Sequence, residues 1–429
     1  MATPHDWFLP AHQEWTAGHR ARAVQCMIAH FNQQARPRAA GLFKQVSYYL
    51  FLLGDYRAAG QILGQGCDEC PEDEEISLNR VVCLSRAGDA SGAIAAGQRL
   101  VDGGSRNPVL FDALASCCAR LGRHAQARGF GSRALELKDV AYGDQPLAKD
   151  WALPSRAPSA VAAGKRRVLS YGLWGQGPRY LNGMLHNLLL APVLYPGWQV
   201  RLYHDDSVPE DFLDIARQLD AELVERPNTD SLRQRLCWRF AVADDPGVGY
   251  FLVRDCDSVI SLREVRAVQM WLTSGRFFHV MRDWWTHTDL VLAGLWGGIA
   301  GVLPSMEGML ADWSPRQVET PNIDQWFLKE RVWRYLRTSL MSHDRCYSLK
   351  VNSRASLAFP DDVLGELPAG NAHVGCDEWT RDPAFQRRQL GPWLRQASWM
   401  QDSPSCLWSV ASMRLATHQP ADPLVQCPA

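Results

Sequence analysis

Residues 250–258 read YFLVRDCDS, an apolar run of four residues followed by two carboxylates with one residue between them. Such a run is typical of a buried strand whose last residues emerge at the edge of a site. Because side chains two apart on a strand point to the same face, Asp255 and Asp257 are expected to converge on one cation. Asp and Ser are also ordinary turn residues, so the motif alone leaves a turn after a strand as a second interpretation.

The chain around this stretch alternates apolar runs with segments of helical spacing. Strands are predicted at residues 167–173, 198–204 and 221–224, and helices at residues 181–195 and 209–219. Alternation of this kind predicts a parallel α/β sheet, in which ligands collect at the carboxyl ends of the strands. A glycine-rich segment at residues 172–177 and two acidic segments at residues 205–206 and 255–257 lie at such ends.

A different pattern occupies the first third of the chain, where glycine recurs in two steps of 34 residues and alanine follows in the same register, at Gly54, Gly88, Gly122, Ala59, Ala93 and Ala127. Glycine permits a tight turn between antiparallel helices, and alanine lets the second helix approach the first. Residues 40–138 therefore resemble tetratricopeptide (TPR) repeats. The resemblance implies a groove for a peptide or partner; the alternatives are a brace for the next domain or a homodimer interface.

Length and composition set the broad class. At 429 residues the chain is expected to hold more than one domain, and its 45 basic and 46 acidic residues argue against a general nucleic-acid binder. Twelve cysteines without a framework spacing, and no signal peptide, favour a reducing, cytoplasmic setting; no transmembrane segment is expected. The predicted division is a repeat domain at 1–140, a linker at 141–165, a sheet domain at 166–350 and a C-terminal extension at 351–429 with a flexible tail.

Residues 165–350 resemble nucleotide-sugar-dependent glycosyltransferases of the GT-A fold. The resemblance rests on an ordered series of motifs rather than on any one of them: R-D-x-D-S at 254–258, M-R-D at 281–283, G-x-W-G at 294–297, D-Q-x-F-L at 324–328 and H-D at 343–344. It implies a Rossmann-like, mostly parallel sheet that binds a nucleoside-diphosphate sugar, following the helical repeat array.

A metal site is part of what the resemblance implies. Asp255 and Asp257 would hold Mn²⁺ or Mg²⁺ against the diphosphate, where negative charge builds as the glycosidic bond breaks. Asp257 is the expected direct ligand, while Asp255 acts through water or on the nucleotide ribose. His343 is expected to complete the site, with a place beside the ligands or at the surface as its alternative, and His373 is the competing candidate.

Asp324 and Gln325 occupy the position at which related enzymes place residues near the anomeric carbon or the acceptor. A free carboxylate there would suit a general base that takes the proton of an acceptor hydroxyl, while the D-Q pair resembles that of retaining enzymes, so the stereochemical outcome stays open. Asp324 is also well placed to cap the helix expected over residues 325–336.

The nucleotide is expected at the ends of the first strands. Tyr171 would stack on the base, the turn beginning at Gly172 would shape the pocket, Arg179 would bind phosphate, and Asp205 would lie at the neighbouring strand end. Arg239 and Arg254 would pair with the acids or the diphosphate, with structural ion pairs as the alternative. Trp284, Trp285 and Trp296 fall in predicted loops around the site, where aromatic faces suit a sugar or peptide acceptor.

The function predicted from the sequence is a cytoplasmic, metal-dependent glycosyltransferase that moves a sugar from a nucleoside diphosphate to a glycan, peptide, protein or small-molecule acceptor. The repeats would recruit the acceptor or a partner. Two alternatives remain: a repeat scaffold with a non-catalytic nucleotide-binding domain, and a metal-dependent nucleotidyltransferase, which would release pyrophosphate instead of a nucleoside diphosphate.

Overall fold

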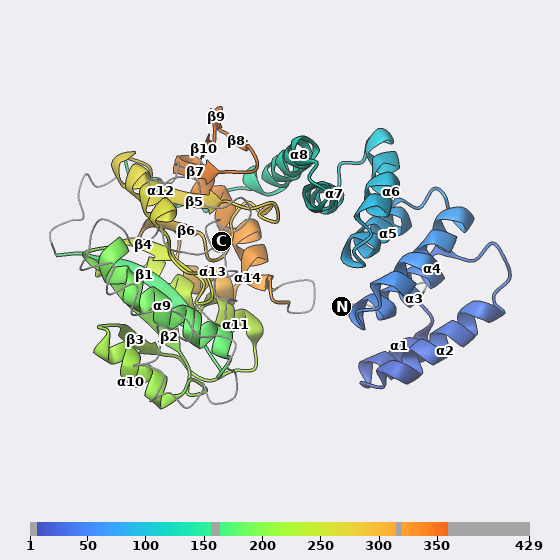
Figure 1. The fold of residues 1–429 in the computed structure, drawn as a ribbon, viewed down its shortest axis with the longest axis horizontal. Coiled ribbons are helices and arrows are strands. Elements are labelled where there is room, and N and C mark those ends of the chain that lie inside the picture. Colours follow the sequence, from blue (N-terminus) through green and yellow to red (C-terminus); the bar gives the residue numbers. More distant parts are fainter. Residues whose placement is uncertain (1–6, 156–163, 315–319, 359–429) are drawn as a thin grey trace. The chain divides into compact units, whose positions relative to one another are not determined.

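The computed structural model describes residues 7–155, 164–314 and 320–358, without the side chains of residues 262–263. The chain divides into two compact units, Met1–Lys138 and Asp139–Ala429 (Figure 1). Most of the predicted C-terminal extension, including His373, lies outside the described residues.

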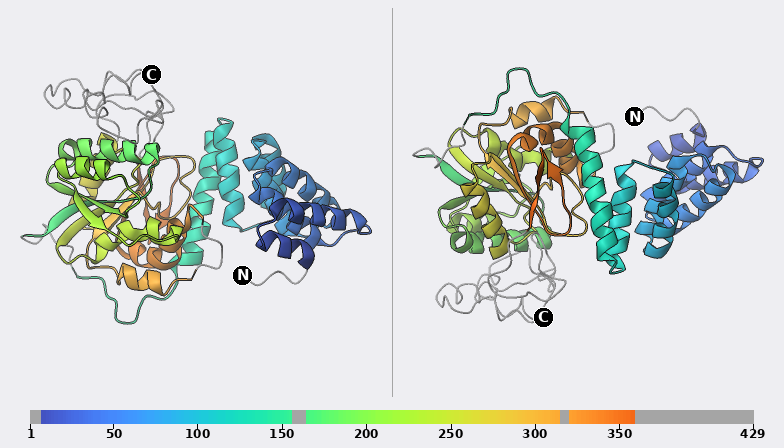
Figure 2. Two further views of the ribbon diagram at one scale, coloured as in Figure 1. Left: turned by 90° about the horizontal axis from the view of Figure 1, so that it is seen from below. Right: turned by 90° about the horizontal axis from the view of Figure 1, so that it is seen from above.

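The first unit is an array of paired helices (Figures 1 and 2). Its elements are α1 (Leu9–Thr16), α2 (Arg20–Gln33), α3 (Ala40–Leu52), α4 (Tyr56–Glu69), α5 (Glu74–Arg86), α6 (Ala90–Asp102), α7 (Pro108–Arg120) and the start of α8 (His124–Gly143). The 34-residue register is confirmed in its physical detail. The glycines between paired helices have positive φ, from +70° to +87° at Gly54, Gly88 and Gly122, a conformation that favours glycine. The alanines of the register, Ala59, Ala93 and Ala127, are fully buried.

The second unit contains a mixed sheet. The described residues form eight strands in the order β10-β7-β5-β6-β4-β1-β2-β3. Their bounds are β1 (Arg166–Leu173), β2 (Trp198–His204), β3 (Glu222–Glu225), β4 (Val248–Val253), β5 (Phe278–Arg282), β6 (Trp296–Ile299), β7 (Leu340–Asp344) and β10 (Leu357–Ala358). All neighbouring pairs are parallel except those of β6, which runs antiparallel to both β4 and β5. The prediction of a helical repeat array followed by a mostly parallel sheet is confirmed.

Helices cover both faces of this sheet (Figure 2). On one face lie α9 (Pro178–Leu194) and α12 (Leu262–Thr273), which Tyr195 and Glu264 join through a hydrogen bond of 2.8 Å. On the other face the 3₁₀ segment η1 (Trp238–Asp244) packs on β1 and β4, and the Ser170 hydroxyl donates to the Arg239 carbonyl at 2.7 Å. Because side chains alternate along a strand, successive residues of β1 face opposite layers, so Tyr171 faces away from η1.

Smaller elements complete the unit. They are α10 (Glu210–Gln218), α11 (Leu232–Cys237), α13 (Met306–Ala311), and a continuous helical segment made of α14 (Ile323–Phe327), η2 (Leu328–Val332), α15 (Trp333–Leu336) and η3 (Arg337–Ser339). A separate hairpin consists of β8 (Lys350–Val351) and β9 (Arg354–Ala355).

Strand β6 corrects one prediction. Trp296 is predicted in a loop near the site, but it begins this strand and is fully buried against Phe240 and Phe251. Two glycines make the close strand contact possible, because a Cβ at Gly297 would lie 2.5 Å from the Phe251 carbonyl oxygen. Two of the four residues of β6, Gly297 and Gly298, are glycine, which is depleted in strands, so the sequence pattern does not predict a strand here.

Candidate functional site

The two carboxylates that open the sequence argument follow the end of β4. The strand ends at Val253, and the Ser258 amide donates to the Asp255 carbonyl at 3.2 Å, which closes a turn. Asp255 and Asp257 therefore lie in a turn and not on the strand, so the prediction that they share a strand face is wrong. In this turn each carboxylate pairs with its own arginine, Arg239 for Asp255 and Arg179 for Asp257.

Arg239 joins Asp255 to Asp324. Its guanidinium pairs with the Asp255 carboxylate, lies 3.0 Å from Oδ2 of Asp324, and donates to the Arg254 carbonyl at 2.9 Å. The side chains of Arg239 and Asp324 are 5% and 4% exposed, whereas that of Asp255 is 39% exposed. One acid of the network thus faces solvent and the other is enclosed, with a buried cation between them.

Two close approaches hold this network in place. The hydrogen bond from Ser170 fixes the backbone of Arg239 against β1. Gly294 lies directly beside Asp255, because a Cβ at this position would come within 2.0 Å of the Asp255 carboxylate. Any larger residue at Gly294 would displace the carboxylate, so the glycine of the G-x-W-G motif has a steric role at the site.

Asp324 has an unusual protonation equilibrium. Burial raises the pKa of its carboxyl group to about 6, and the charge on Asp255 acts in the same direction, while Arg239 and the Gln325 amide oppose the rise. The capping interpretation is not supported, because Asn322 is the N-cap of α14 and makes no side-chain cap bond. Oδ1 of Asp324 instead accepts from the amide of Gln325, whose side chain is half-buried. Asp324 is therefore an enclosed acid whose pKa is raised to about 6, chiefly by burial.

Asp257 lies beside the first turn of α9. Nη2 of Arg179 is 2.8 Å from its Oδ2, and the Arg179 side chain is 57% exposed. Helix α9 approaches the turn so closely that a Cβ on Gly183 would lie 2.4 Å from the Cys256 carbonyl oxygen. Asn187 on the same helix donates to the Cys256 and Ser258 carbonyls. Helix α9 therefore positions both the turn and its exposed arginine.

His343 does not join the carboxylates. Strands β6 and β5 separate its strand, β7, from β4, and the residue is fully buried with Nδ1 2.8 Å from Nε2 of His279. Burial lowers the pKa of His343 to about 4. Across the described ranges, no three His, Cys, Asp or Glu side chains lie together in a group that could hold a metal ion. The predicted set of Asp255, Asp257 and His343 is thus not assembled, and the competing His373 lies outside the described residues.

Tyr171 does not lie where the predicted stacking on a nucleotide base would require. It is fully buried on the face of β1 toward α9 and α12, where burial, followed by the charge on Glu264, raises the pKa of the phenol. No base could stack on this ring. Arg254 lies on the same side, with Nε 2.7 Å from Glu264 and Nη1 donating to the Val253 and Trp296 carbonyls. Its structural interpretation is therefore the correct one.

The ends of β1 and β2 are joined by polar contacts. Asp205 is fully buried, accepts from the Ser207 amide at 3.1 Å and lies 3.1 Å from Nη2 of Arg235. Ser207 in turn accepts from the Gly175 amide at 2.7 Å. Gly172 accepts from the Cys256 thiol at 3.2 Å, and a Cβ there would make only ordinary contacts. Asp205 and Gly172 thus shape the strand ends.

An aromatic pair that the sequence pattern does not predict lies at this edge. Trp174 follows β1 directly, Trp238 precedes Arg239, and their half-buried rings meet edge to face with centroids 6.4 Å apart. The sequence does hint at both residues, because Trp174 lies in the turn that begins at Gly172 and Trp238 adjoins Arg239. The sequence alone does not tell which of its 17 tryptophans leave the core.

Comparison with known proteins adds little. No protein-family model and no curated protein matches the chain. Among solved structures, MamA of MSR-1 is 15% identical over 30% of this chain and 74% of its own, with a TM-score of 0.28. A mutant of Thermobaculum terrenum O-GlcNAc transferase is 14% identical, with a TM-score of 0.33, over 57% of this chain and 44% of that one. At these TM-scores neither likeness bears on the site.

None of the helices in the described part of the chain combines the length and hydropathy that a membrane crossing requires.

Proposed function

We propose that the chain is a glycosyltransferase that moves a sugar from a nucleoside diphosphate to an acceptor, with Mn²⁺ or Mg²⁺ at the diphosphate. The observation that carries the proposal is the gathering of Asp255, Asp257, Arg239, Asp324 and Arg179 where β4 ends and α9 begins. This is the carboxyl edge of the parallel strands β1, β2 and β4, at which α/β sheets bind their ligands.

Transfer of the sugar requires a cation at the leaving diphosphate and a base for the acceptor proton. In the reaction the bond between the anomeric carbon and the diphosphate oxygen breaks, a bond to the acceptor oxygen forms, and the acceptor hydroxyl loses its proton. Arg179 is exposed and within reach of Asp257, so it is suited to neutralise the departing diphosphate. Asp324, with a pKa of about 6, is suited to receive a proton near neutral pH.

The carboxylates of the D-x-D turn are of the ligand type that suits a divalent cation. Asp255 and Asp257 offer the hard oxygen ligands that Mg²⁺ and Mn²⁺ prefer, and such ions take further ligands from substrate phosphates instead of a complete protein cage. When bound, the ion would neutralise negative charge on the leaving group. Arg239 and Arg179 already balance these acids in the described structure, so donor binding has to exchange at least one of these ion pairs.

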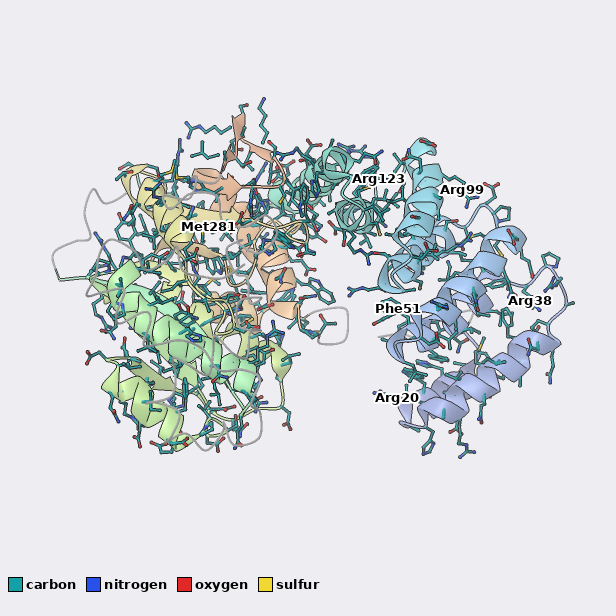
Figure 3. The ribbon with its side chains drawn as sticks, viewed as in Figure 1. Arg20, Arg38, Phe51, Arg99, Arg123 and Met281 are labelled. Atoms are coloured by element: carbon teal, nitrogen blue, oxygen red, sulfur yellow. The ribbon has the colours of Figure 1, made fainter. Side chains whose placement is uncertain are left out.

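Two further features are suited to recognise the donor and the acceptor. The rings of Trp174 and Trp238 offer half-buried aromatic faces near Arg239 for a base or sugar ring. The repeat unit, considered by itself, has a hollow of about 420 Å³ lined by Tyr48, Phe51 and Leu52 among others, and Figure 3 labels Phe51. Tyr48 and Leu52 are 37% and 47% exposed, so this hollow is suited to recruit an acceptor or partner segment.

Purified protein provides the test. With Mn²⁺ present, at least one nucleotide sugar from a panel should raise the unfolding temperature and be transferred or hydrolysed with release of a nucleoside diphosphate. Asp257→Ala should abolish turnover. Asp214→Ala removes a carboxylate from the exposed surface of α10, with its side chain 60% exposed, and should leave turnover unchanged.

Three outcomes would contradict the proposal. Neither binding nor turnover with any donor would leave a repeat scaffold as the better interpretation. Release of pyrophosphate in place of a nucleoside diphosphate would indicate a nucleotidyltransferase. Full turnover by the Asp257→Ala variant would remove the turn after β4 from the chemistry.

A further inference from the structure

A cleft lies away from the D-x-D turn, where β5 and β7 begin. Its volume is about 530 Å³, and its walls include Arg276, Arg337 and Arg354. Arg276 precedes β5, Arg337 lies in η3 before β7, and Arg354 belongs to β9. Three separate segments of the chain thus contribute arginines to one cleft, called the arginine cleft from here on.

The charge of the arginine cleft is only partly balanced. Among the described residues that line it there is no Asp or Glu. Arg337 is held by Asp139 at 3.1 Å and by Asp144 at 2.8 Å, which fix its guanidinium and offset its charge. Within the described ranges neither Arg276 nor Arg354 has a carboxylate partner. Among the described residues two positive charges of the cleft therefore remain without a paired acid, in a chain whose net charge is −1.

The hairpin that carries Arg354 is held in an uncommon conformation. Asn352 and Ser353 between its strands have φ of 49° and 63°, a region that side-chain-bearing residues rarely adopt. The Asn352 amide donates to the Arg337 carbonyl at 2.8 Å, so the turn is tied to the wall of the cleft. Backbone strain of this kind is often found where a binding surface is prearranged. Arg354 follows this turn and lines the cleft together with Arg337.

The remaining walls are apolar. Leu340, Met341 and Leu357 line the cleft, and Leu357 is 39% exposed. We propose that the arginine cleft binds a phosphorylated small molecule, with the phosphate on Arg276 and Arg354 and an apolar part on these side chains. Guanidinium groups match phosphate oxygens in paired hydrogen bonds, and the volume is within the range of about 300–1,000 Å³ typical of small-ligand sites. An extended nucleic acid would need more phosphate contacts than two arginines provide.

This site is separate from that of the proposed transfer reaction. Strands β4, β5 and β7 run in the same direction, since β6 is antiparallel to β4 and β5 and β7 is parallel to β5. The D-x-D turn follows the end of β4, whereas the arginine cleft lies at the start of β5 and β7. Binding in the cleft is therefore independent of Asp257 and of the nucleotide sugar.

Calorimetric titration of the full chain with phenyl phosphate, in the absence of divalent cations, tests the proposal. One saturable site is expected, with tighter binding than inorganic phosphate because the phenyl ring packs on the apolar wall. Arg354→Gln and Arg276→Gln should each weaken binding by about tenfold, the loss expected for one charge-assisted contact. Arg354 is exposed, so its replacement should leave the fold intact.

Two control variants make the result specific. Arg217→Gln removes an arginine from α10, where it pairs with Glu210 and Asp214, and should not change the affinity. Asp257→Ala should also bind normally, which separates this test from that of the proposed transfer reaction. The inference is overturned by an absence of saturable binding, by equal affinities of Arg354→Gln and wild type, by loss of binding in Asp257→Ala, or by binding to anionic lipid vesicles without binding to phenyl phosphate.

Discussion

Tyr171 shows how the phase of one strand decides the role of a residue. It is predicted to stack on the base because it adjoins the turn that begins at Gly172, yet it faces α9 and α12 while its neighbour Ser170 faces Arg239. Its hydroxyl is buried and has no hydrogen-bond partner among the described residues. A buried polar group without a partner carries a desolvation cost.

Tyr171→Phe should therefore stabilise the protein by about 1 kcal/mol, since it removes that cost without leaving a cavity. Donor affinity should not change, because the ring is fully buried. Urea unfolding and donor titration check the two expectations. A loss of donor affinity with unchanged stability would restore the stacking role.

Asp324 carries a prediction about pH. If this carboxylate receives the acceptor proton, the transfer rate should rise with pH through about 6, where the group loses its own proton. Asp324→Asn should lower the rate by about 100-fold or more and remove this rise. A pH series of initial rates at saturating donor is the measurement. An unchanged profile in the variant would assign the rise to another group.

The same shift has a consequence for stability. Because the pKa of Asp324 is raised above the ordinary value of 3.8, the folded chain holds its proton more tightly than the unfolded chain. Its contribution to stability is present below pH 3.8 and is lost as pH rises through about 6.

At the scale of elements, helix α9 is fitted to the D-x-D turn through Gly183. A Cβ there would lie 2.4 Å from the Cys256 carbonyl oxygen and 2.8 Å from the Cα of Asp257. Both atoms belong to the backbone, so no side-chain rotation relieves the overlap. The helix and the turn would have to separate.

Gly183→Ala should destabilise the protein by about 1–3 kcal/mol, the usual cost of overpacking, and should lower the affinity for the donor. Gly308→Ala in α13 is the matched control. Its Cβ would meet only ordinary contacts at 3.5 Å or more, so a helix-favouring gain of about 0.5–1 kcal/mol is expected. Urea unfolding of both variants gives the comparison, and a destabilised Gly308→Ala with an unaffected Gly183→Ala would reverse the assignment.

At the scale of the whole molecule, buried histidines set the response to acid. Burial lowers the pKa of His186 to about 3 and that of His343 to about 4, and burial followed by the charge on His343 lowers the pKa of His279. Each binds a proton more readily in the unfolded chain. Their contribution to stability is present above the ordinary pKa of about 6.5 and is lost as pH falls toward the folded values.

The free energy of unfolding should therefore fall between pH 7 and pH 5, with Asp324 opposing only part of the loss. Each histidine contributes a slope of up to about 1.4 kcal/mol per pH unit. His186→Gln should reduce the slope by that amount. His19→Gln, at a side chain that is 56% exposed, should leave it unchanged. Urea unfolding at a series of pH values measures the slopes, and equal slopes in all three proteins would contradict the assignment.

The fold could be predicted from the sequence where local patterns are strong. The spacing of Gly54, Gly88 and Gly122 determines the helical register, because each turn needs a positive φ and each helix pair needs a small contact residue. Alternating apolar runs determine strands β1 to β4 and place the D-x-D turn at the carboxyl edge. In these cases the deciding interactions are made between residues close in the chain.

Tertiary structure decided the rest, because the deciding contacts join residues far apart in sequence. The antiparallel insertion of β6 separates His343 from the carboxylates, and the helix packed on each face of β1 decides whether a side chain reaches the site. The pairing of Arg239 with Asp324 spans 85 positions. The sequence alone determined which acids lie at the strand edge. Only packing decided that each acid has an arginine partner and that, among the described residues, no histidine joins them. The physical reason is that burial and charge balance depend on elements that the whole fold brings together.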